Sequence, residues 1–394
     1  MKISRYFAAW ICLMAAFFTT SVNLETFGFA EGAGEPLKAL ATVVSVALAA
    51  LALNQSGVVL PRRLRLTPLF MWSFVLFAAI SIVWSFAVTE TFTAIFASVL
   101  TASCVFLLLS LTLERALQCI TDAILFVSLA SLIFSLVSPD AFVAHHGVMR
   151  LQGVFFGPHA LAVPATLGAA IVASGLLGPR SRWKVRLAAV SFTLCIALTF
   201  SRQAYLSAAL AVLAASYFRT SGWARPLLGV AIAVGSVAAL GWMSLTGSDV
   251  TTYASRGEGD DVMTLTGRTY IWDAAIGLIQ SKPLTGFGFG AGGAALKAFY
   301  EADGGWTTRN AHNSLLQVGL DLGWPGMLLY AGLLVLFFKK VANGPRSFTV
   351  PACLSIVLIS AVERGIYGFG TLVSIIFLYI LFMRSTAVSG MQHA

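Results

Sequence analysis

The residues best suited to chemistry are one histidine and several arginines that lie far apart in the sequence. His312 lies in the segment NAHNSLL, where Asn310 and Asn313 offer amide groups that can fix the orientation of its ring. A neutral imidazole near pH 7 can accept a proton from an attacking hydroxyl group. His312 is therefore the candidate general base, with a polar cap at a helix start as the alternative.

Four arginines are candidates for binding a negatively charged substrate. Arg150 lies in MRLQGVFFGPHALA, Arg202 in TFSRQAYL, Arg268 in LTGRTYIW and Arg309 shortly before the histidine. Guanidinium groups stay charged and offer paired donors to phosphate oxygens, so several of them in one pocket suit a pyrophosphate leaving group. Arginines at helix ends also extend toward lipid phosphates, which is the alternative for each of them taken singly. Arg202 fits that alternative least, because it falls between two closely spaced helix ends.

The sequence contains candidate residues for a metal or nucleotide site, but their pattern does not support either. The candidate metal ligands are the histidines His145, His146 and His159 and the acidic pair Asp260 and Asp261. No carboxylate or cysteine is aligned with the histidines, and the acidic pair fits a solvated loop. The glycines of GFGFGAGG are not followed by the Lys-Ser/Thr pair of a phosphate-binding loop. The sequence therefore predicts no metal and no nucleotide cofactor.

Composition places these residues in a membrane protein. The chain is 58% hydrophobic and 10% charged, with a mean hydropathy of +0.86, whereas soluble domains are about 25% charged. Apolar runs of a length that crosses or nearly crosses a bilayer predict about twelve transmembrane helices. They lie at 6–23, 36–54, 67–87, 91–111, 116–137, 159–177, 187–200, 203–218, 226–245, 315–338, 348–362 and 370–384, with the tenth broken at Gly323-Trp324-Pro325.

The distribution of charge predicts the orientation. Twelve spans put both termini on one side, and that side collects 16 of the 25 basic residues, so the positive-inside rule makes both termini cytoplasmic. The net charge of +9 is then a signal of topology, and no nucleic-acid partner is expected. The first run resembles a signal peptide but leads directly to a second span, so it is interpreted as a retained helix. The expected fold is an all-α polytopic membrane protein, with residues 1–394 as one transmembrane domain.

Two connections on the predicted outer side are long enough to be functional. One covers residues 138–158, and the other, at 246–311, is the large periplasmic loop. Within the latter, Thr266 is expected to cap an amphipathic helix with Ile271, Ala275 and Leu278 on one face. A second short helix is expected at AALKAFYEAD. In the last outer turn, Glu363-Arg364 suggests a local ion pair, and the five cysteines inside predicted spans suggest packing residues only.

Several motifs together resemble a known family. SRQAYL, TGRTYIW, KPLTGFGFG and AHNSLLQVGLDLGWPG look like the core of the bacterial O-antigen ligase and O-antigen or exopolysaccharide polymerase superfamily. Their order and spacing also agree, over roughly residues 145–340, while the first five spans agree only in hydropathy. The resemblance implies a membrane glycosyltransferase of the GT-C type that works at the periplasmic face of the bacterial inner membrane.

The resemblance also implies roles for the candidate residues. Arg202 and Arg268 become the diphosphate clamps and His312 the general base or acceptor-orienting residue, while Arg150 takes the place of the family's earlier arginine. Arg309 is a further candidate for substrate binding. His159 stands where the family pattern leads us to expect a smaller amide. The implied donor is a glycan on undecaprenyl diphosphate, and no metal or cofactor is implied.

The acceptor separates the alternatives that the sequence leaves open. A polymerase extends a lipid-linked glycan, whereas a ligase transfers it to lipid A core. The form LTGRTYIW…PLTGFGFG favours the polymerase. Membrane lipids and polysaccharide export machinery are the further partners expected. A transporter or flippase would need ionisable groups near the bilayer midplane. Asp122 and Asp321, which lie within predicted spans, are both nearer an end.

Overall fold

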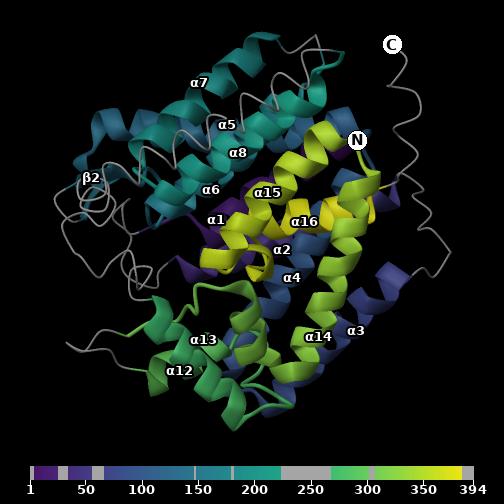
Figure 1. Ribbon diagram of the computed structural model, residues 1–394, viewed down its shortest axis with the longest axis vertical. Helices are drawn as coiled ribbons and strands as arrows, with labels where there is room; N and C mark the ends of the chain where they lie inside the picture. Colours follow the sequence, from purple (N-terminus) through teal and green to yellow (C-terminus); the bar gives the residue numbers. More distant parts are fainter. Residues whose placement is uncertain are drawn as a thin grey trace.

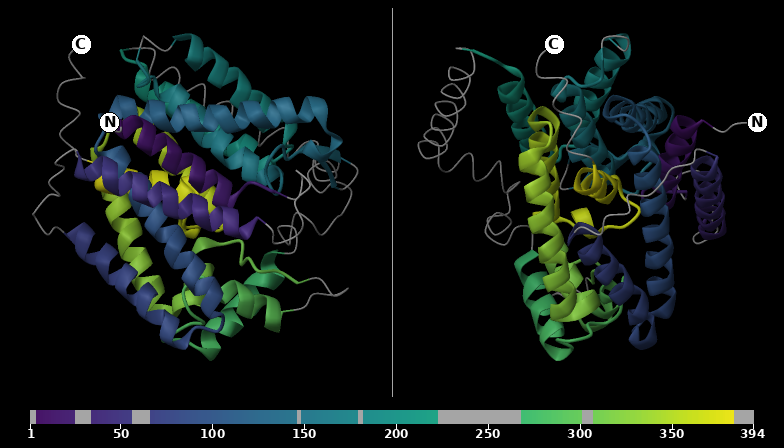
Figure 2. Two further views of the ribbon diagram at one scale, coloured as in Figure 1. Left: turned by 180° about the vertical axis from the view of Figure 1, so that it is seen from behind. Right: turned by 90° about the vertical axis from the view of Figure 1, so that its right-hand side faces the viewer.

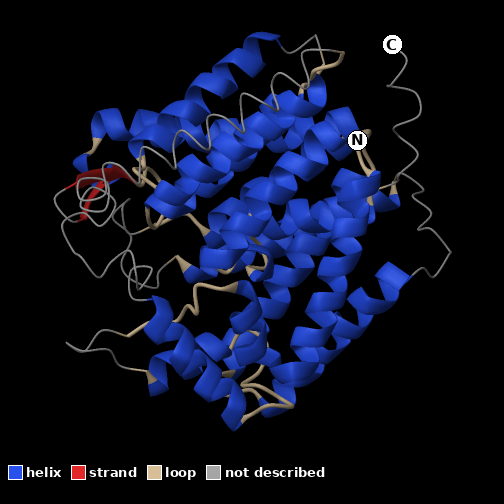
Figure 3. Ribbon diagram, viewed as in Figure 1, coloured by secondary structure: helices blue, strands red, loops and turns tan. Residues whose placement is uncertain are grey.

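The computed structural model describes residues 4–24, 34–55, 66–145, 148–178, 182–222, 268–300 and 307–383. Within these ranges the protein is almost entirely helical (Figures 1 and 3). Helices occupy every predicted apolar run except 226–245, which lies outside the described residues. They are α1 (Arg5–Thr20), α2 (Glu35–Asn54), α3 (Leu66–Ile80), α4 (Val88–Leu109), α5 (Leu113–Val137), α6 (Pro158–Ser174), α7 (Arg182–Leu198), α8 (Arg202–Arg219), α14 (Ser314–Asn343), α15 (Arg346–Val362) and α16 (Leu372–Phe382).

Length and hydropathy separate these helices into two groups. Among the described residues, four helices are long and apolar enough to cross a membrane: α2, α4, α5 and α14. Further apolar helices of 10–17 residues include α1, α6, α15 and α16. The apolar helices make this an integral membrane protein, while the total of about twelve spans remains a prediction. The five cysteines are free and buried, as expected of packing residues.

A small β-hairpin, which the sequence analysis did not predict, interrupts the otherwise helical fold. Strands β1 (Phe142–His145) and β2 (Val148–Leu151) are antiparallel, with Val143 opposite Arg150. The short 3-10 helix η3 (Pro139–Ala141) leads into this hairpin. The carbonyl of Ala141 accepts from the backbone N–H groups of Gln152 and Gly153, at 2.9 and 3.0 Å. The hairpin thus sets the backbone position of Arg150.

Contacts between helix ends agree with the predicted alternation of sides. At the end predicted to be cytoplasmic, Arg5 donates to the carbonyl of Ser110 at 3.2 Å, and Gln118 donates to that of Leu177 at 2.9 Å. At the opposite end, the backbone N–H of Asn23 donates to the carbonyl of Val154 at 3.0 Å. Segments predicted on one side therefore contact each other.

The described part of the large loop forms two short helices that pack against α14. These are α12 (Arg268–Ser281) and α13 (Gly292–Phe299), which lie together at one end of the molecule (Figures 1 and 2). The predicted apolar face of α12 is buried through Ile271 and Ala275, and Leu278 packs beside it. These side chains join Leu296 of α13 in a small cluster of their own. The expected amphipathic helix is confirmed, while its proposed cap, Thr266, lies outside the described residues.

The break predicted in the tenth run occurs at Gly323. Its φ of 63° and ψ of −163° interrupt the helical backbone of α14. A side chain at this position would also collide with the carbonyl oxygen of Pro283, 2.4 Å from an ideal Cβ. The same carbonyl accepts from the backbone N–H of Trp324 at 2.8 Å. The kink therefore joins the short first part of α14 to the segment that follows α12.

Candidate functional site

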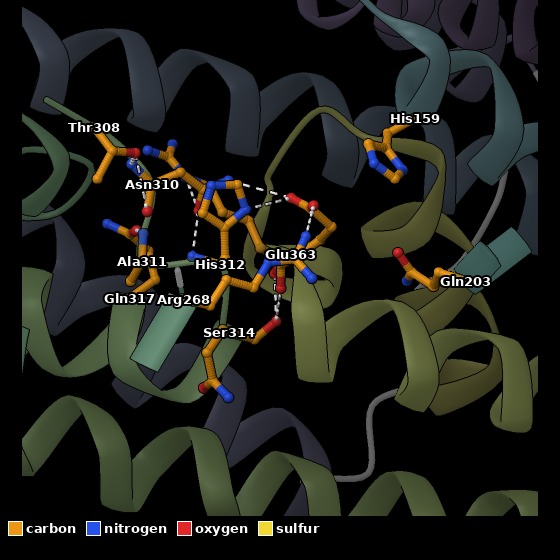
Figure 4. Close-up of polar contacts among 12 residues, drawn as sticks. His159, Gln203, Arg268, Thr308, Asn310, Ala311, His312, Ser314, Gln317 and Glu363 are labelled. Carbon is orange, nitrogen blue, oxygen red and sulfur yellow. Dashed lines mark hydrogen bonds and ion pairs between the residues drawn. The ribbon is translucent and has the colours of Figure 1, made fainter. Parts of the chain in front are cut away.

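Glu363, the residue that follows α15, contacts two of the predicted site residues, Arg268 and His312. Its Oε1 lies 3.0 Å from Nη2 of Arg268, and its Oε2 lies 3.1 Å from Nδ1 of His312. The side-chain amide of Asn310 donates to the same Oε2 at 3.3 Å. Figure 4 shows His312 and Arg268 directed toward this carboxylate. The structure therefore brings together two predicted site residues that lie far apart in the sequence.

Electrostatics keeps the Glu363 carboxylate charged. Burial raises its pKa, but the hydrogen bond from His312 and the surrounding electrostatics, which include the positive charge of Arg268, lower it by more. The pKa of Glu363 is therefore lowered from its ordinary value. Because the side chains of Glu363 and His312 are 19% and 24% exposed, solvent screens this interaction only in part.

The backbone at His312 adopts a conformation that is uncommon for a histidine. Its φ of 49° lies in the left-handed region, which costs free energy for a residue with a Cβ. The side-chain oxygen of Asn310 accepts from the His312 backbone N–H at 3.0 Å, and Asn313 caps α14 by accepting from the N–H of Leu315 at 2.9 Å. These amides hold the turn that aims the ring at Glu363.

Arg364 supports this turn from a second direction. Its Nε donates to the side-chain oxygen of Asn310 at 3.2 Å, and its Nη2 donates to the carbonyl of Arg309. The hydroxyl of Ser314 donates to the carbonyl of Arg364. The prediction of a local ion pair between Glu363 and Arg364 is wrong. At the end of α15 the two side chains point to different partners, Glu363 to Arg268 and His312, and Arg364 to Asn310. Sequence reasoning therefore missed the connections that both residues make across about fifty positions.

A buried hydrogen-bond chain holds the residue before His312. The indole N–H of Trp272 donates to the carbonyl of Ala311 at 2.9 Å, and the N–H of Ala311 donates to Gln317 at 3.2 Å. Gln317 in turn donates to the carboxylate of Asp321 at 3.3 Å. Since a buried polar group without partners is costly, this chain resists displacement of Ala311.

Asp321 connects the same chain to the glycine-rich segment and to the turn after α15. Its fully buried carboxylate accepts from the backbone N–H groups of Gly290 and Gly292, at 2.6 and 2.8 Å. It also accepts from the hydroxyl of Tyr367, in the 3-10 helix η5 (Gly365–Tyr367), at 2.7 Å. Gly290 has a φ of 77°, which disfavours any residue with a side chain there. The GFGFGAGG segment therefore positions the site through Asp321.

Arg150 and Arg202 lie at a second corner, formed by β2 and the start of α8. Arg150 is buried, and its Nε donates to the carbonyl of Thr199 at 2.9 Å, just before α8. Arg202 is the exposed first residue of α8. The N-cap residue of α8 is Ser201, and its hydroxyl oxygen lies 3.2 Å from Nδ1 of His159.

Arg309 forms an ion pair with Glu90, whereas Arg268 and His312 contact Glu363. Nη1 of Arg309 lies 2.8 Å from Oε1 of Glu90, near the start of α4, and both side chains are exposed. Its guanidinium is therefore part of a surface ion pair.

The metal-ligand candidates His146, Asp260 and Asp261, which the sequence analysis did not favour, lie outside the described residues.

Part of the chain matches a known protein family. Residues 187–331 match a family model described as O-Antigen ligase. The matched segment includes every predicted site residue except Arg150, and Glu363 lies beyond its end. The match confirms the resemblance to the O-antigen ligase and polymerase superfamily that the motifs predicted. No curated protein matches the chain.

Proposed function

We propose that this chain, which carries an O-antigen ligase domain at residues 187–331, transfers a glycan from undecaprenyl diphosphate to a sugar hydroxyl. The observation that carries this proposal is the contact of His312 and Arg268 with the same Glu363 carboxylate. A base oriented by a carboxylate, beside a guanidinium that can bind phosphate, suits the transfer of a group from a diphosphate. The proposed place of the reaction is the periplasmic face of the bacterial inner membrane.

In the proposed reaction the acceptor hydroxyl attacks the anomeric carbon of the donor glycan. The carbon–oxygen bond to the diphosphate breaks, and the diphosphate leaves with the bonding electron pair. The hydroxyl proton moves to Nε2 of His312, because Nδ1 faces Glu363 and carries the other proton. The Glu363 carboxylate then stabilises the imidazolium that forms. Positioning and electrostatics supply most of the acceleration.

The arginines have the complementary task of stabilising the leaving group. Arg268 lies beside the base, so one of its donors can stay on Glu363 while others turn to a phosphate oxygen. Arg202 and Arg150 supply positive charge from the second corner. Their guanidinium groups replace the positive charge that a metal ion would otherwise supply to a leaving diphosphate.

We therefore expect transfer to need no divalent metal. Protein purified in detergent should transfer glycan from undecaprenyl diphosphate at an undiminished rate in excess EDTA. The assay measures lengthened or transferred glycan against time, with and without added Mg²⁺ or Mn²⁺. Loss of transfer in EDTA that Mg²⁺ or Mn²⁺ restores would contradict the arginine mechanism and direct attention to Asp260, Asp261 or the outer histidines as ligands. A protein without transfer under any condition would contradict the proposed function itself.

We favour a polymerase that joins lipid-linked repeat units into exopolysaccharide or O-antigen, because of the LTGRTYIW…PLTGFGFG form of its motifs. The second candidate is a ligase that uses lipid A core as acceptor, favoured by the description of the matching family. The glycan profile of a deletion strain distinguishes them. Loss of long chains with single repeat units still transferred is expected for a polymerase. Accumulation of long lipid-linked chains without transfer would instead identify a ligase.

A further inference from the structure

We infer that His159 binds the diphosphate of the donor through a hydrogen bond from Nε2. This inference rests on the proposed function, since it takes the donor to be a lipid diphosphate. His159 is the second residue of α6, and its ring lies where α6 approaches the start of α8. It is thus placed between the corner that carries Arg202 and the Glu363 site.

The partner of the ring determines which nitrogen is available to a ligand. Nδ1 of His159 lies 3.2 Å from the hydroxyl oxygen of Ser201. The same oxygen accepts from the backbone N–H of Ala204 at 3.4 Å, because Ser201 caps α8. The hydroxyl has one hydrogen and can donate it to Nδ1 while its oxygen accepts from the helix, and we assign this direction to the contact. In a neutral imidazole whose Nδ1 accepts, Nε2 carries the hydrogen and is a donor.

This donor has no protein acceptor within the described part of the chain. There, the hydrogen bond of the ring is the one made through Nδ1. A half-buried donor normally finds a partner. Its Nε2–H is therefore suited to an oxygen of a bound substrate.

The charges around the ring indicate an anion as that partner. His159 lies within electrostatic range of Arg150, Arg268 and His312 as well as of Glu363. Figure 4 shows the ring directed toward the space between Glu363 and Gln203. A neutral donor next to guanidinium groups adds a charge-assisted hydrogen bond to a phosphate oxygen without adding charge. Among the groups of the proposed substrates, the diphosphate matches this combination.

The test compares three variants for binding of undecaprenyl diphosphate to the purified full-length protein, with transfer measured in parallel. His159→Leu removes the donor, and we expect binding to weaken about 10- to 100-fold, the loss typical of a hydrogen bond to a charged group. His159→Gln carries an amide N–H that can reach the position of Nε2, so it should restore most of the affinity. Thr166→Val, on the same helix, is the matched control. The hydroxyl of Thr166 is buried without a hydrogen-bond partner, so its removal should leave binding unchanged.

The outcomes separate this inference from the proposed function. If His159→Leu binds undecaprenyl diphosphate as tightly as the wild type does, the inference is wrong even when the wild type transfers glycan. If His159→Leu and His159→Gln weaken binding equally, the donor role is also wrong. The loss would then come from the shape of the side chain and not from its N–H group. If the wild-type protein neither binds this lipid nor transfers from it, the proposed function fails and the inference fails with it.

Discussion

Replacing His312 with alanine should abolish glycan transfer while the protein still inserts into the membrane and binds its donor. Proton transfer by a positioned base contributes about 10²- to 10⁴-fold to a rate, so transfer should fall by at least that range. The measurement is glycan output normalised to the amount of protein in the membrane. Donor binding should change little, because Arg268 and the other arginines remain.

The unusual backbone of His312 requires a second variant as control. The φ of His312 is 49°, a conformation that alanine adopts poorly. A lower amount of His312→Ala protein in the membrane could therefore come from the backbone as well as from the lost contacts of the ring. Asparagine tolerates the left-handed region better than most residues. His312→Asn should therefore be closer to normal abundance yet equally inactive. Normal glycan from either variant would remove the assignment of His312 as the base.

The parts of the site that could be predicted from the sequence follow from local patterns. The buried face of α12 follows from apolar residues three and four positions apart, such as Ile271 and Ala275. The break in α14 follows from Gly323 and the proline shortly after it. Arg268 and His312 were identifiable because they lie within, or just after, the long polar segment 246–311 of an otherwise apolar sequence.

The parts that could not be predicted depend on where distant segments meet. His312 and Glu363 are separated by 51 residues, and nothing in the short sequence around Glu363 indicates that partner. Its neighbour Arg364 suggested a local pair instead, because the direction of two adjacent side chains depends on how α15 ends. The hairpin at Arg150 was missed for a related reason, since strands of four residues give too short a pattern to detect.

The contact between Arg268 and Glu363 has a consequence for substrate entry. Nη2 of Arg268 is bound to the carboxylate that also contacts His312. In the proposed reaction the donor diphosphate would approach a guanidinium that already binds one anion. Because a guanidinium has five N–H donors, it can bind the diphosphate without releasing Glu363. We therefore expect Glu363 to hold Arg268 and His312 near each other before and during binding.

The second large effect is expected for Glu363→Gln. A glutamine keeps the size of the side chain but loses its charge, so it neither fixes the tautomer of His312 nor stabilises the imidazolium. In a serine protease, the comparable change at the triad carboxylate lowers turnover about 10⁴-fold, and we expect transfer here to fall by about 10²- to 10⁴-fold. Glu90→Gln is the matched control. It removes the carboxylate of an exposed ion pair with Arg309, and such pairs contribute little to stability.

The pH dependence of stability gives an independent measurement on the same variant. The pKa of Glu363 is lowered in the folded protein, so its ionised form stabilises the fold at pH values above the pKa of the unfolded chain. That contribution is lost as the pH falls through the lowered pKa. Glu363→Gln should therefore lower the thermal unfolding temperature in detergent at pH 7, and the difference from wild type should shrink in acid. Full transfer by Glu363→Gln, or a difference in unfolding temperature that grows in acid, would show that the carboxylate does not hold His312 and Arg268 through its charge.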